Sequence, residues 1–427
     1  MNNERINEIL GVREAFELPE KLLKSVLENN TKLYDIFISE EPDLEKDLFN
    51  EYYQTEHGDR DKLKQDFTPQ ELAYLVNCLA GEGEKAADIC AGTGTLTINN
   101  WKIDKNRKHH IEEYSSRALP ILLFNLAIRN INAEVWHMDV LSREVFGVYE
   151  VKQSEKYSTV TKIEKEYNTE KQDIVVMNPP YSLKWDGKND ERFEEYGVAP
   201  KSKADFAFLL HGLNMLKENG TLIAILPHGV LFRGAAEGKI RQKLIEEGII
   251  YAVIGLPEKL FLNTGIPTCI LVLKKKRASR DILFIDASKQ FKKVGKNNKM
   301  EEQHINNVIK LCNKRKAVKK QSYLASFEDI KDNDFNLNIP RYVDTFEPEK
   351  IEPLDTILKE LINIDAEIKE TEEKFYEMFM QLESEEGLDE EKKLLRKYME
   401  SEKTLESKRE KILKICNSNG GQLIWEI

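Results

Sequence analysis

The segment ADICAGTGTL, residues 87–96, ends a short apolar run with an acid and then passes through a glycine turn into a helical segment. Glycine tolerates positive φ and lets the backbone come close to a ligand. The turn Gly92-Thr93-Gly94, after Asp88 at the strand end, can therefore form one wall of a nucleotide-like pocket. A glycine pattern this short is equally typical of an ordinary βα turn, so the surrounding sequence decides between the two interpretations.

Short apolar runs alternate with helical patterns from about residue 65 to residue 290. The runs include KAADIC, DIVVMN, TLIAILP and TCILVLKKK, and DFAFLLHGLNMLKENG is one of the helical patterns between them. This alternation predicts βαβ units, and the continuous apolar character of the runs predicts a mostly parallel sheet that is buried on both faces. The predicted fold class is a Rossmann-like, doubly wound α/β domain. Two polar stretches, 150–171 and 182–203, are expected to be surface excursions.

The rest of the chain has a different texture. Residues 1–64 carry short amphipathic patterns and predict a small N-terminal helical region, followed by the α/β domain at 65–345 and a helical tail at 346–427. Within the domain, 291–345 is expected to be irregular. Its basic run CNKRKAVKK, 312–320, is typical of a solvated helix face, and a DNA-phosphate patch is the alternative.

Apolar residues in the tail follow one another by alternating steps of three and four, which is the a/d pattern of a coiled coil. This seam consists of Leu354, Ile357, Leu361, Ile364, Ile368, Thr371, Phe375, Met378 and Leu382. A weaker seam returns at Leu395, Tyr398, Leu405 and Ile412. Two helices joined by a turn can hide one seam against the other, or the tail can dock on another chain, and the two interpretations are compatible.

Composition limits the functions open to the chain. It has 427 residues, 41% of them hydrophobic, and a net charge of −11, so its surface as a whole repels polyanions. Contact with nucleic acid would need a local positive patch or a partner. The five cysteines form no CxxC pair and no metal-ligand spacing, which favours reduced thiols in a cytoplasmic protein. The N-terminus resembles no signal peptide, and no stretch approaches the roughly 18 apolar residues of a membrane span.

Acidic residues end two further apolar runs. HHIEEY ends the second run with Glu112 and Glu113, at the position where nucleotide-binding α/β folds hydrogen-bond a ribose diol. VWHMDV ends the third with Asp139, from which a carboxylate could reach an adenine amino group. His137 beside it is expected to be packed or exposed, because neither a nucleophile nor a metal ligand lies nearby in the sequence.

The tetrapeptide Asn178-Pro179-Pro180-Tyr181 follows another apolar run. The prolines fix φ and remove two backbone donors, so the Asn178 side-chain oxygen and the Pro179 carbonyl remain as a pair of acceptors. Such a pair can hold both hydrogens of an amino group and direct the nitrogen lone pair at an electrophile. Tyr181 adds a flat face on which a base can stack. A simple Pro-Pro turn after a strand is the alternative.

Together these segments resemble the modification (methyltransferase) subunit of type I restriction-modification systems, a family of N6-adenine DNA methyltransferases. The resemblance runs in order through QDFTPQEL (65–72), DICAGTGTL, EEYSSRALPILLFNLAIRNI and NPPYS. It continues through the stretch from 196 to 287, which includes YGVAPKSKADF, ILPHGVLFRGAAEGKIRQ and DILFIDAS and narrows the match to this family. The glycine turn departs from the family's pattern at Ile89 and Thr95.

The resemblance implies S-adenosylmethionine as cofactor and a class I methyltransferase fold. It implies that the cofactor is bound by Gln65, Asp66, Phe67, Thr68, Pro69, Gln70, Asp88, Gly92, Thr93, Gly94, Thr95, Glu113 and Asp139. The catalytic residues it implies are Asn178, Pro179, Pro180 and Tyr181. Glu113 is preferred to Glu112 because it precedes Asn125 of NLAIR by twelve residues. No metal is implied.

The resemblance also implies partners. These are double-stranded DNA with a flipped adenine, a specificity subunit bound through the C-terminal helices, and a restriction (nuclease-translocase) subunit as an optional further member. Two alternatives are a free-standing amino-methyltransferase acting on protein glutamine or RNA, and a non-catalytic scaffold of the same fold.

Overall fold

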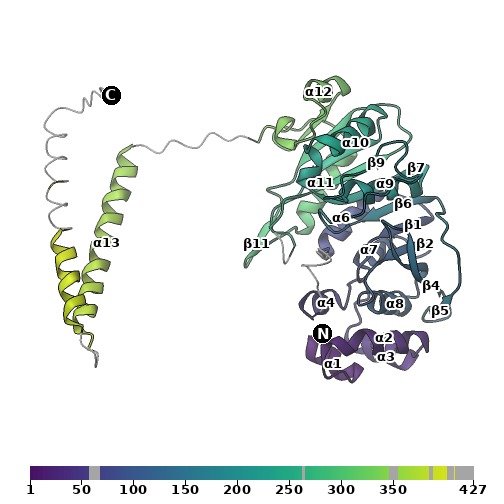
Figure 1. Ribbon diagram of the computed structural model, residues 1–427, viewed down its shortest axis with the longest axis horizontal. Helices are drawn as coiled ribbons and strands as arrows, with labels where there is room; N and C mark the ends of the chain where they lie inside the picture. The colour runs from purple at the N-terminus through teal and green to yellow at the C-terminus, as the bar shows by residue number, and fades with distance from the viewer. Residues whose placement is uncertain (57–67, 262–264, 346–353, 384–387, 402–407, 409–427) are drawn as a thin grey trace. The chain divides into compact units, whose positions relative to one another are not determined.

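The computed structural model describes residues 1–56, 68–261, 265–345, 354–383, 388–401 and 408. The chain divides into two compact units, Met1–Phe346 and Glu347–Ile427. Figure 1 shows the first unit as an α/β body and the second as a helical segment that ends the chain. No helix among these described residues is long and apolar enough to cross a membrane.

Among the described residues, eleven strands form one sheet. In spatial order they are β13 (Ser322–Ala325), β10 (Ile282–Asp286), β8 (Ile250–Gly255), β9 (Thr268–Lys274), β7 (Leu216–Pro227), β6 (Gln172–Met177), β1 (Lys85–Ile89), β2 (Lys108–Glu113), β3 (Asn132–Asp139), β4 (Glu144–Lys152) and β5 (Thr159–Ile163). The five central strands, β7, β6, β1, β2 and β3, are parallel to one another. The predicted α/β class is confirmed.

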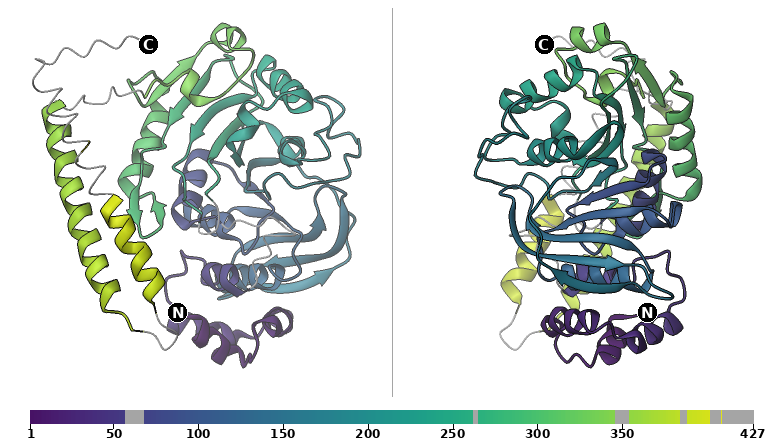
Figure 2. Two further views of the ribbon diagram at one scale, coloured as in Figure 1. Left: turned by 60° about the vertical axis from the view of Figure 1, so that its left-hand side comes forward. Right: turned by 90° about the vertical axis from the view of Figure 1, so that its right-hand side faces the viewer.

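Alternate residues of the central strands pack on opposite faces of the sheet. Val175 and Met177 of β6 belong to a core that includes α9 (Asp205–Met215) and α10 (Ala235–Glu246). Ile174 and Val176 belong to another core, with α6 (Gln70–Ala80) and α11 (Glu302–Lys314). This period of two explains why the runs are apolar throughout, since both faces are covered by helices (Figure 2).

The N-terminal helices pack against α8 (Leu119–Ile128) rather than forming a core of their own. They are α1 (Asn3–Leu10), η1 (Ala15–Glu17), α2 (Leu18–Leu27), α3 (Thr31–Glu40) and α4 (Asn50–Glu56). Phe124 of α8 lies edge-on to Tyr34, Phe37 and Phe49, with ring centroids 4.9–5.5 Å apart. These fully buried rings join the first fifty residues to the sheet.

Two expectations for the α/β body need correction. The stretch 150–171 is not only a surface excursion, because β4 and β5 extend the sheet there as antiparallel strands. Their residues alternate between buried and exposed, so the apolar runs that mark buried strands are missing. The region 291–345 is also more regular than expected. It contains β11 (Lys292–Val294), β12 (Asn297–Lys299), α11, β13, α12 (Phe327–Asp332) and η3 (Ile339–Arg341).

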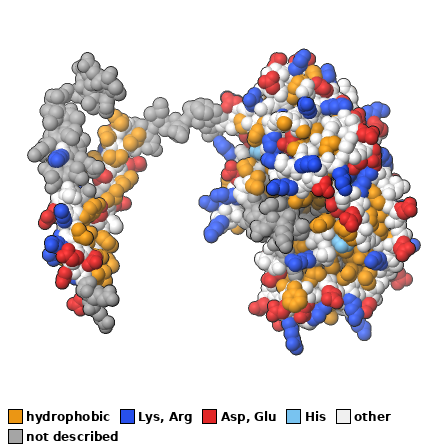
Figure 3. Space-filling view, in the orientation of Figure 1, with side chains coloured by type: hydrophobic (Ala, Val, Ile, Leu, Met, Phe, Trp, Pro, Cys, Tyr) orange, Lys and Arg blue, Asp and Glu red, His pale blue; other side chains and the backbone are white. Residues whose placement is uncertain are grey.

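The second unit begins with α13, Leu354–Gln381, and residues 389–401 are helical as well. None of the residues of α13 is buried. The seam residues Leu354, Leu361 and Met378 are 71%, 54% and 70% exposed, and Figure 3 shows hydrophobic side chains along this helix. The described part of the tail therefore leaves the predicted seam uncovered, and the weaker seam at Leu405 and Ile412 lies outside the described residues.

Candidate active site

The glycine turn connects β1 to α7 (Thr95–Ile103) at the carboxyl edge of the parallel strands. Gly94 is the N-cap of α7 and has φ of +93°. A Cβ at this position would lie 2.8 Å from Leu122 Cδ1 of α8. Glycine is therefore required at this position, both by the left-handed backbone conformation and by the close packing of the turn against α8.

Glu113 ends β2 beside this turn. Its carboxylate accepts hydrogen bonds from the backbone N–H of Gly92 and of Ser115, both at 2.6 Å. Burial raises the pKa of Glu113, and these backbone donors oppose that rise. The two bonds leave further lone pairs on the carboxylate, as a ligand with two hydroxyl groups requires.

Glu112 points to the other side of the strand and has different partners. It accepts from Tyr167 at 2.6 Å and contacts His110 and His211, each at 2.9 Å. Burial acts against the charged form, but the nearby charge of His211 and hydrogen bonds from both histidines hold the pKa of Glu112 well below its usual range. Of the two adjacent acids, only Glu113 lines the cavity described below.

Asp139 ends β3 and shapes the segment that follows it. Its carboxylate accepts from the Leu141 N–H and the Ser142 hydroxyl, both at 2.9 Å. The carbonyls of Val140 and Leu141 are held by the buried guanidinium of Arg192, at 2.6 and 2.9 Å.

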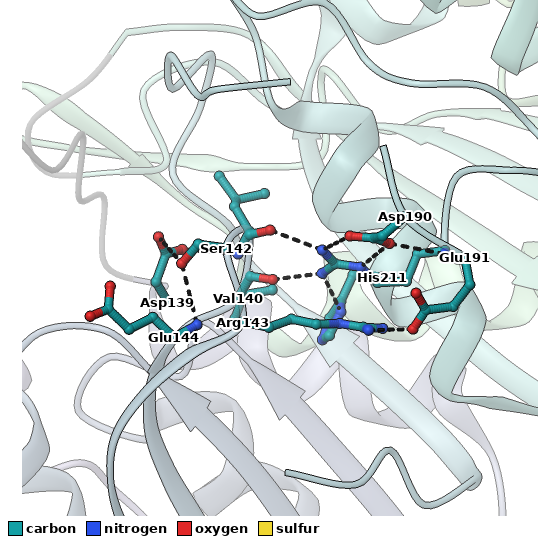
Figure 4. A network of polar contacts seen from close by, with 10 residues as sticks. Asp139, Val140, Ser142, Arg143, Glu144, Asp190, Glu191 and His211 are labelled. Carbon is teal, nitrogen blue, oxygen red and sulfur yellow. Dashed lines mark hydrogen bonds and ion pairs between the residues drawn. The ribbon is translucent and has the colours of Figure 1, made fainter. Parts of the chain in front are cut away.

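Arg192 comes from the polar stretch 182–203 that follows the Asn-Pro-Pro-Tyr segment. It also forms an ion pair with Asp190 at 2.6 Å and a hydrogen bond with His211 Nδ1 at 3.0 Å. Figure 4 shows Asp139 and Val140 on one side of this network and Asp190 and His211 on the other. The guanidinium therefore joins two segments that both line the cavity.

The amide of Asn178, directly after β6, is fixed at both ends. Its Nδ2 donates to Thr68 Oγ1 at 2.9 Å, and its Oδ1 accepts from the Tyr181 hydroxyl at 2.7 Å. Tyr181 is 6% exposed, and its ring lies edge-on to Phe261 with centroids 6.1 Å apart.

A segment from the N-terminal region holds the glycine turn from behind. Asp47 Oδ2 accepts from the hydroxyls of Thr93 and Thr95 at 2.5 and 2.8 Å, and its Oδ1 accepts from Asn125 Nδ2 at 2.8 Å. Asn50 Nδ2 donates to Thr95 Oγ1 at 2.8 Å. We call Asp47 and Asn50 the N-terminal brace.

These walls enclose a cavity of about 400 Å³. The predicted site residues that line it are Thr68, Gly92, Thr95, Glu113, Asp139, Asn178 and Pro180. Those that do not line it are Pro69, Gln70, Asp88, Thr93, Gly94, Pro179 and Tyr181. Gln65, Asp66 and Phe67 lie outside the described residues. The structure thus brings the ends of β1, β2, β3 and β6, together with Thr68 two residues before α6, to one cavity.

Several residues at the site were not predicted from the sequence. The brace lies more than forty residues before the turn it holds, and Arg192 sits in a stretch of mixed charge. Tyr114, which lines the cavity and is 52% exposed, could have been found, because it directly follows Glu113. Asp88 is buried behind the turn, where its Oδ2 accepts from Thr97 and its Oδ1 has no hydrogen-bond partner among the described residues.

The sheet order and the cavity at the strand ends define an α/β methyltransferase fold. Residues 47–351 match the family described as N-6 DNA Methylase, and the chain belongs to that family. Two proteins similar in sequence are the type I restriction enzyme MpnII methylase subunit of Mycoplasma pneumoniae and the type I restriction enzyme MjaVII methylase subunit of Methanocaldococcus jannaschii. The chain is 31% identical to MpnII, over 67% of its own length and 54% of that protein. It is 30% identical to MjaVII, over 72% of its own length and 53% of that protein.

A solved structure from Streptococcus thermophilus, a type I restriction-modification system methyltransferase subunit, is 39% identical and aligns with a TM-score of 0.59. The alignment covers 66% of this chain and 60% of the Streptococcus thermophilus chain. A modification subunit of a putative type I restriction enzyme from Vibrio vulnificus has 15% identity and a TM-score of 0.53, over 75% and 67% of the two chains, and supports the fold alone. The chain spans about half the length of the curated relatives it matches.

Proposed function

We propose that the chain is a DNA adenine N6-methyltransferase subunit of a type I restriction-modification system, with sequence specificity supplied by a separate subunit. The observation that carries this proposal is the position of Asn178. Its amide, fixed by Thr68 and Tyr181, borders the same cavity as Glu113 and the glycine turn. An acceptor for an amino group therefore lies beside a pocket suited to a nucleoside.

S-adenosylmethionine fits the residues around the cavity. The Glu113 carboxylate has lone pairs left for two ribose hydroxyls, and the absence of a Cβ at Gly92, which lines the cavity, lets a ligand approach the turn. Tyr114 offers an exposed ring next to Glu113, and Asp139 lies at the next strand end. When bound, this cofactor supplies an electrophilic methyl group on a sulfonium sulfur.

The chain's own residues act on the amino group of the target adenine. In this proposal Asn178 Oδ1 accepts one N–H and the Pro179 carbonyl accepts the other. With both hydrogens held, the nitrogen becomes pyramidal and its lone pair points into the cavity, which favours in-line attack by positioning. The bound cofactor would supply the methyl group for the new N–C bond, with its S–C bond breaking in the same step, and the amine would then lose a proton. Flipping the adenine costs a few kcal/mol, which these contacts offset.

Tyr181 has a second task in this scheme, as a stacking surface for the flipped base. Its ring is packed edge-on against Phe261, so stacking requires the two rings to separate. Residues 262–264, directly after Phe261, lie outside the described residues. The hydrogen bond from the Tyr181 hydroxyl to Asn178, in contrast, forms without any movement of the two rings.

The tail supports the proposed partner. The seam on α13 leaves large apolar side chains 43–71% exposed, and a long helix of a second chain would cover them. We assign this surface to the specificity subunit. A restriction subunit as a further member, and a cytoplasmic setting in which the described cysteines stay reduced, belong to the same proposal.

The test is transfer of labelled methyl groups from S-adenosylmethionine to genomic DNA. The full chain is assayed alone and with the specificity subunit encoded beside it, and we expect N6-methyladenine only in the second case. Asn178→Ala should abolish transfer in protein that circular dichroism shows to be folded, and Asn313→Ala, on the exposed face of α11, is the control for an asparagine substitution outside the site. Full transfer by Asn178→Ala would refute the mechanism. Transfer without the partner would favour a free-standing enzyme.

A further inference from the structure

A hairpin after β10 concentrates positive charge on an acidic chain. Residues 287–300, ASKQFKKVGKNNKM, include five lysines and no acidic residue, whereas the whole chain has a net charge of −11. β11 and β12 pair antiparallel within this segment, which we call the basic hairpin. Figure 3 shows Lys and Arg side chains projecting at the place where Figure 1 draws the hairpin.

The basic hairpin is anchored to the segments that border Asn178. Lys299 forms an ion pair of 2.7 Å with Glu71, in the first turn of α6 and three residues after the cavity-lining Thr68. Asn298 donates to the carbonyls of Lys259 and Glu258 at 2.9 and 2.8 Å. That loop leads to Phe261, which packs on Tyr181. The hairpin therefore contacts two segments that lead to the proposed acceptor site.

Three of the five lysines of the basic hairpin lack an ion-pair partner within the described ranges. Lys292 pairs with Glu301 at 3.0 Å, but Lys289, Lys293 and Lys296 have no carboxylate within ion-pair distance among the described residues. All three are exposed. Three exposed lysine ammonium groups with no carboxylate partner in the described part of the chain favour an anion from outside it.

The hairpin also lies on the correct edge of the sheet. β10 is parallel to β8, and through the antiparallel β9 both run in the same direction as β7 and β6. The carboxyl end of β10, from which the hairpin emerges, is thus on the same edge as Asn178. Four strand spacings of about 4.8 Å separate β6 from β10, or about 19 Å. At 3.4 Å per base pair this is about six base pairs of duplex.

The other basic run lies on the opposite edge. Arg315 of the run 312–320 donates to the carbonyls of Tyr251 and Asp281, at the amino ends of β8 and β10. Its guanidinium is 3.9 Å from the Tyr251 ring centroid. This arginine stabilises the fold, and its neighbours Lys316 and Lys319 are exposed.

We propose that the basic hairpin binds DNA phosphates about six base pairs from the adenine held at Asn178. This inference rests on the proposed function, because it takes the duplex that carries the target base as its ligand. Phosphates attract lysines regardless of sequence, so the contact positions the duplex and reads no bases.

The experiment measures DNA affinity as a function of salt. The full chain, in whichever form transfers methyl groups, is titrated against a fluorescent 30-base-pair duplex of arbitrary sequence between 50 and 300 mM KCl. Lys293→Ala/Lys296→Ala is compared with the control Lys316→Ala/Lys319→Ala, which removes the same charge from the opposite edge. Loss of two phosphate contacts should flatten the slope of log K against log salt by about 1.8 and weaken binding by up to about 60-fold at 0.1 M salt. The control should match the unsubstituted chain.

The outcomes separate this inference from the proposed function. Equal slopes and affinities for the two double variants, in protein that methylates DNA normally, would overturn the hairpin inference alone. Failure of the unsubstituted protein to methylate DNA in any form would overturn both. Calorimetric binding of S-adenosylmethionine should be the same in all variants, because the hairpin does not line the cavity.

Discussion

Replacing Asp47 by asparagine tests whether the N-terminal brace holds the glycine turn in its binding conformation. The carboxylate accepts from Thr93, Thr95 and Asn125 at 2.5–2.8 Å. An asparagine keeps one oxygen and replaces the other with an NH₂ group. If the NH₂ faces Asn125, two donors oppose each other. If it faces the threonines, both hydroxyls must turn to accept, although Thr95 already accepts from Asn50.

The size of the effect follows from the two bonds to the turn. A hydrogen bond to a charged group contributes about 1.5–3 kcal/mol and a neutral one about 0.5–1.5 kcal/mol, so Asp47→Asn loses about 1 kcal/mol per threonine. If the free turn opens, the total of about 2 kcal/mol appears in binding as a loss of up to about 30-fold in affinity for S-adenosylmethionine.

Titration calorimetry of the folded variant with S-adenosylmethionine measures this loss directly. Asp43→Asn is the matched control, because Asp43 lies in the same segment but pairs with Lys46 at 2.7 Å instead of the turn. We expect an affinity loss of 10- to 30-fold for Asp47→Asn and less than twofold for Asp43→Asn. Equal affinities in the two variants would refute a role of the brace in shaping the turn.

Three further predictions follow from buried polar groups. Burial raises the pKa of Asp88 from 3.8 to about 7, so the folded chain binds an extra proton between these values and becomes less stable as pH rises through them. Asp88→Asn should remove this pH dependence and raise the free energy of unfolding by about 4 kcal/mol at pH 8. Urea unfolding of both proteins at pH 5 and pH 8 measures this difference. The same change in unfolding free energy between the two pH values in both proteins would contradict the prediction. Arg192→Lys removes the guanidinium that donates to two carbonyls of the cavity wall, so KM for S-adenosylmethionine should rise with little change in kcat. A fall in kcat alone would contradict a role of Arg192 in positioning this wall. Tyr181→Phe removes the hydroxyl bond to Asn178 and should lower kcat about fivefold at unchanged cofactor affinity, whereas an unchanged kcat would mean that this bond does not orient the amide.

The sheet was predictable because its central strands are apolar on both faces. Val175 and Met177 on one face and Ile174 and Val176 on the other give DIVVM a pattern that only a covered strand explains. The antiparallel strands β4 and β5, at one end of the sheet, were missed because one face is open to solvent, so their sequence is mainly polar. α11 was missed although Ile305, Val308 and Leu311 are spaced for a helix, since charged and amide residues between them gave the region an irregular appearance.

Strand ends were also predictable, because parallel strands bring the residues after them to one edge. Glu113, Asp139 and Asn178 each follow an apolar run, and all three line the cavity. Whether a side chain at a strand end lines the cavity depends on tertiary packing, which the spacing of residues in the sequence does not reveal. Asp88 ends a strand in the same way but lies behind the turn, and Tyr181 packs on Phe261 rather than lining the cavity.

The two halves of the site are joined by contacts between segments that are far apart in sequence. Asn178 donates to the Thr68 hydroxyl, and Asn50 donates both to the Thr68 carbonyl at 3.4 Å and to the Thr95 hydroxyl at 2.8 Å. The proposed acceptor amide and the proposed cofactor turn are therefore linked through one side chain of the N-terminal region. A change at Asn50 should alter cofactor affinity and methyl transfer together, whereas a change at Asn178 should alter transfer alone. This difference follows from the arrangement of the chain around the cavity, because Asn50 contacts both walls and Asn178 contacts one.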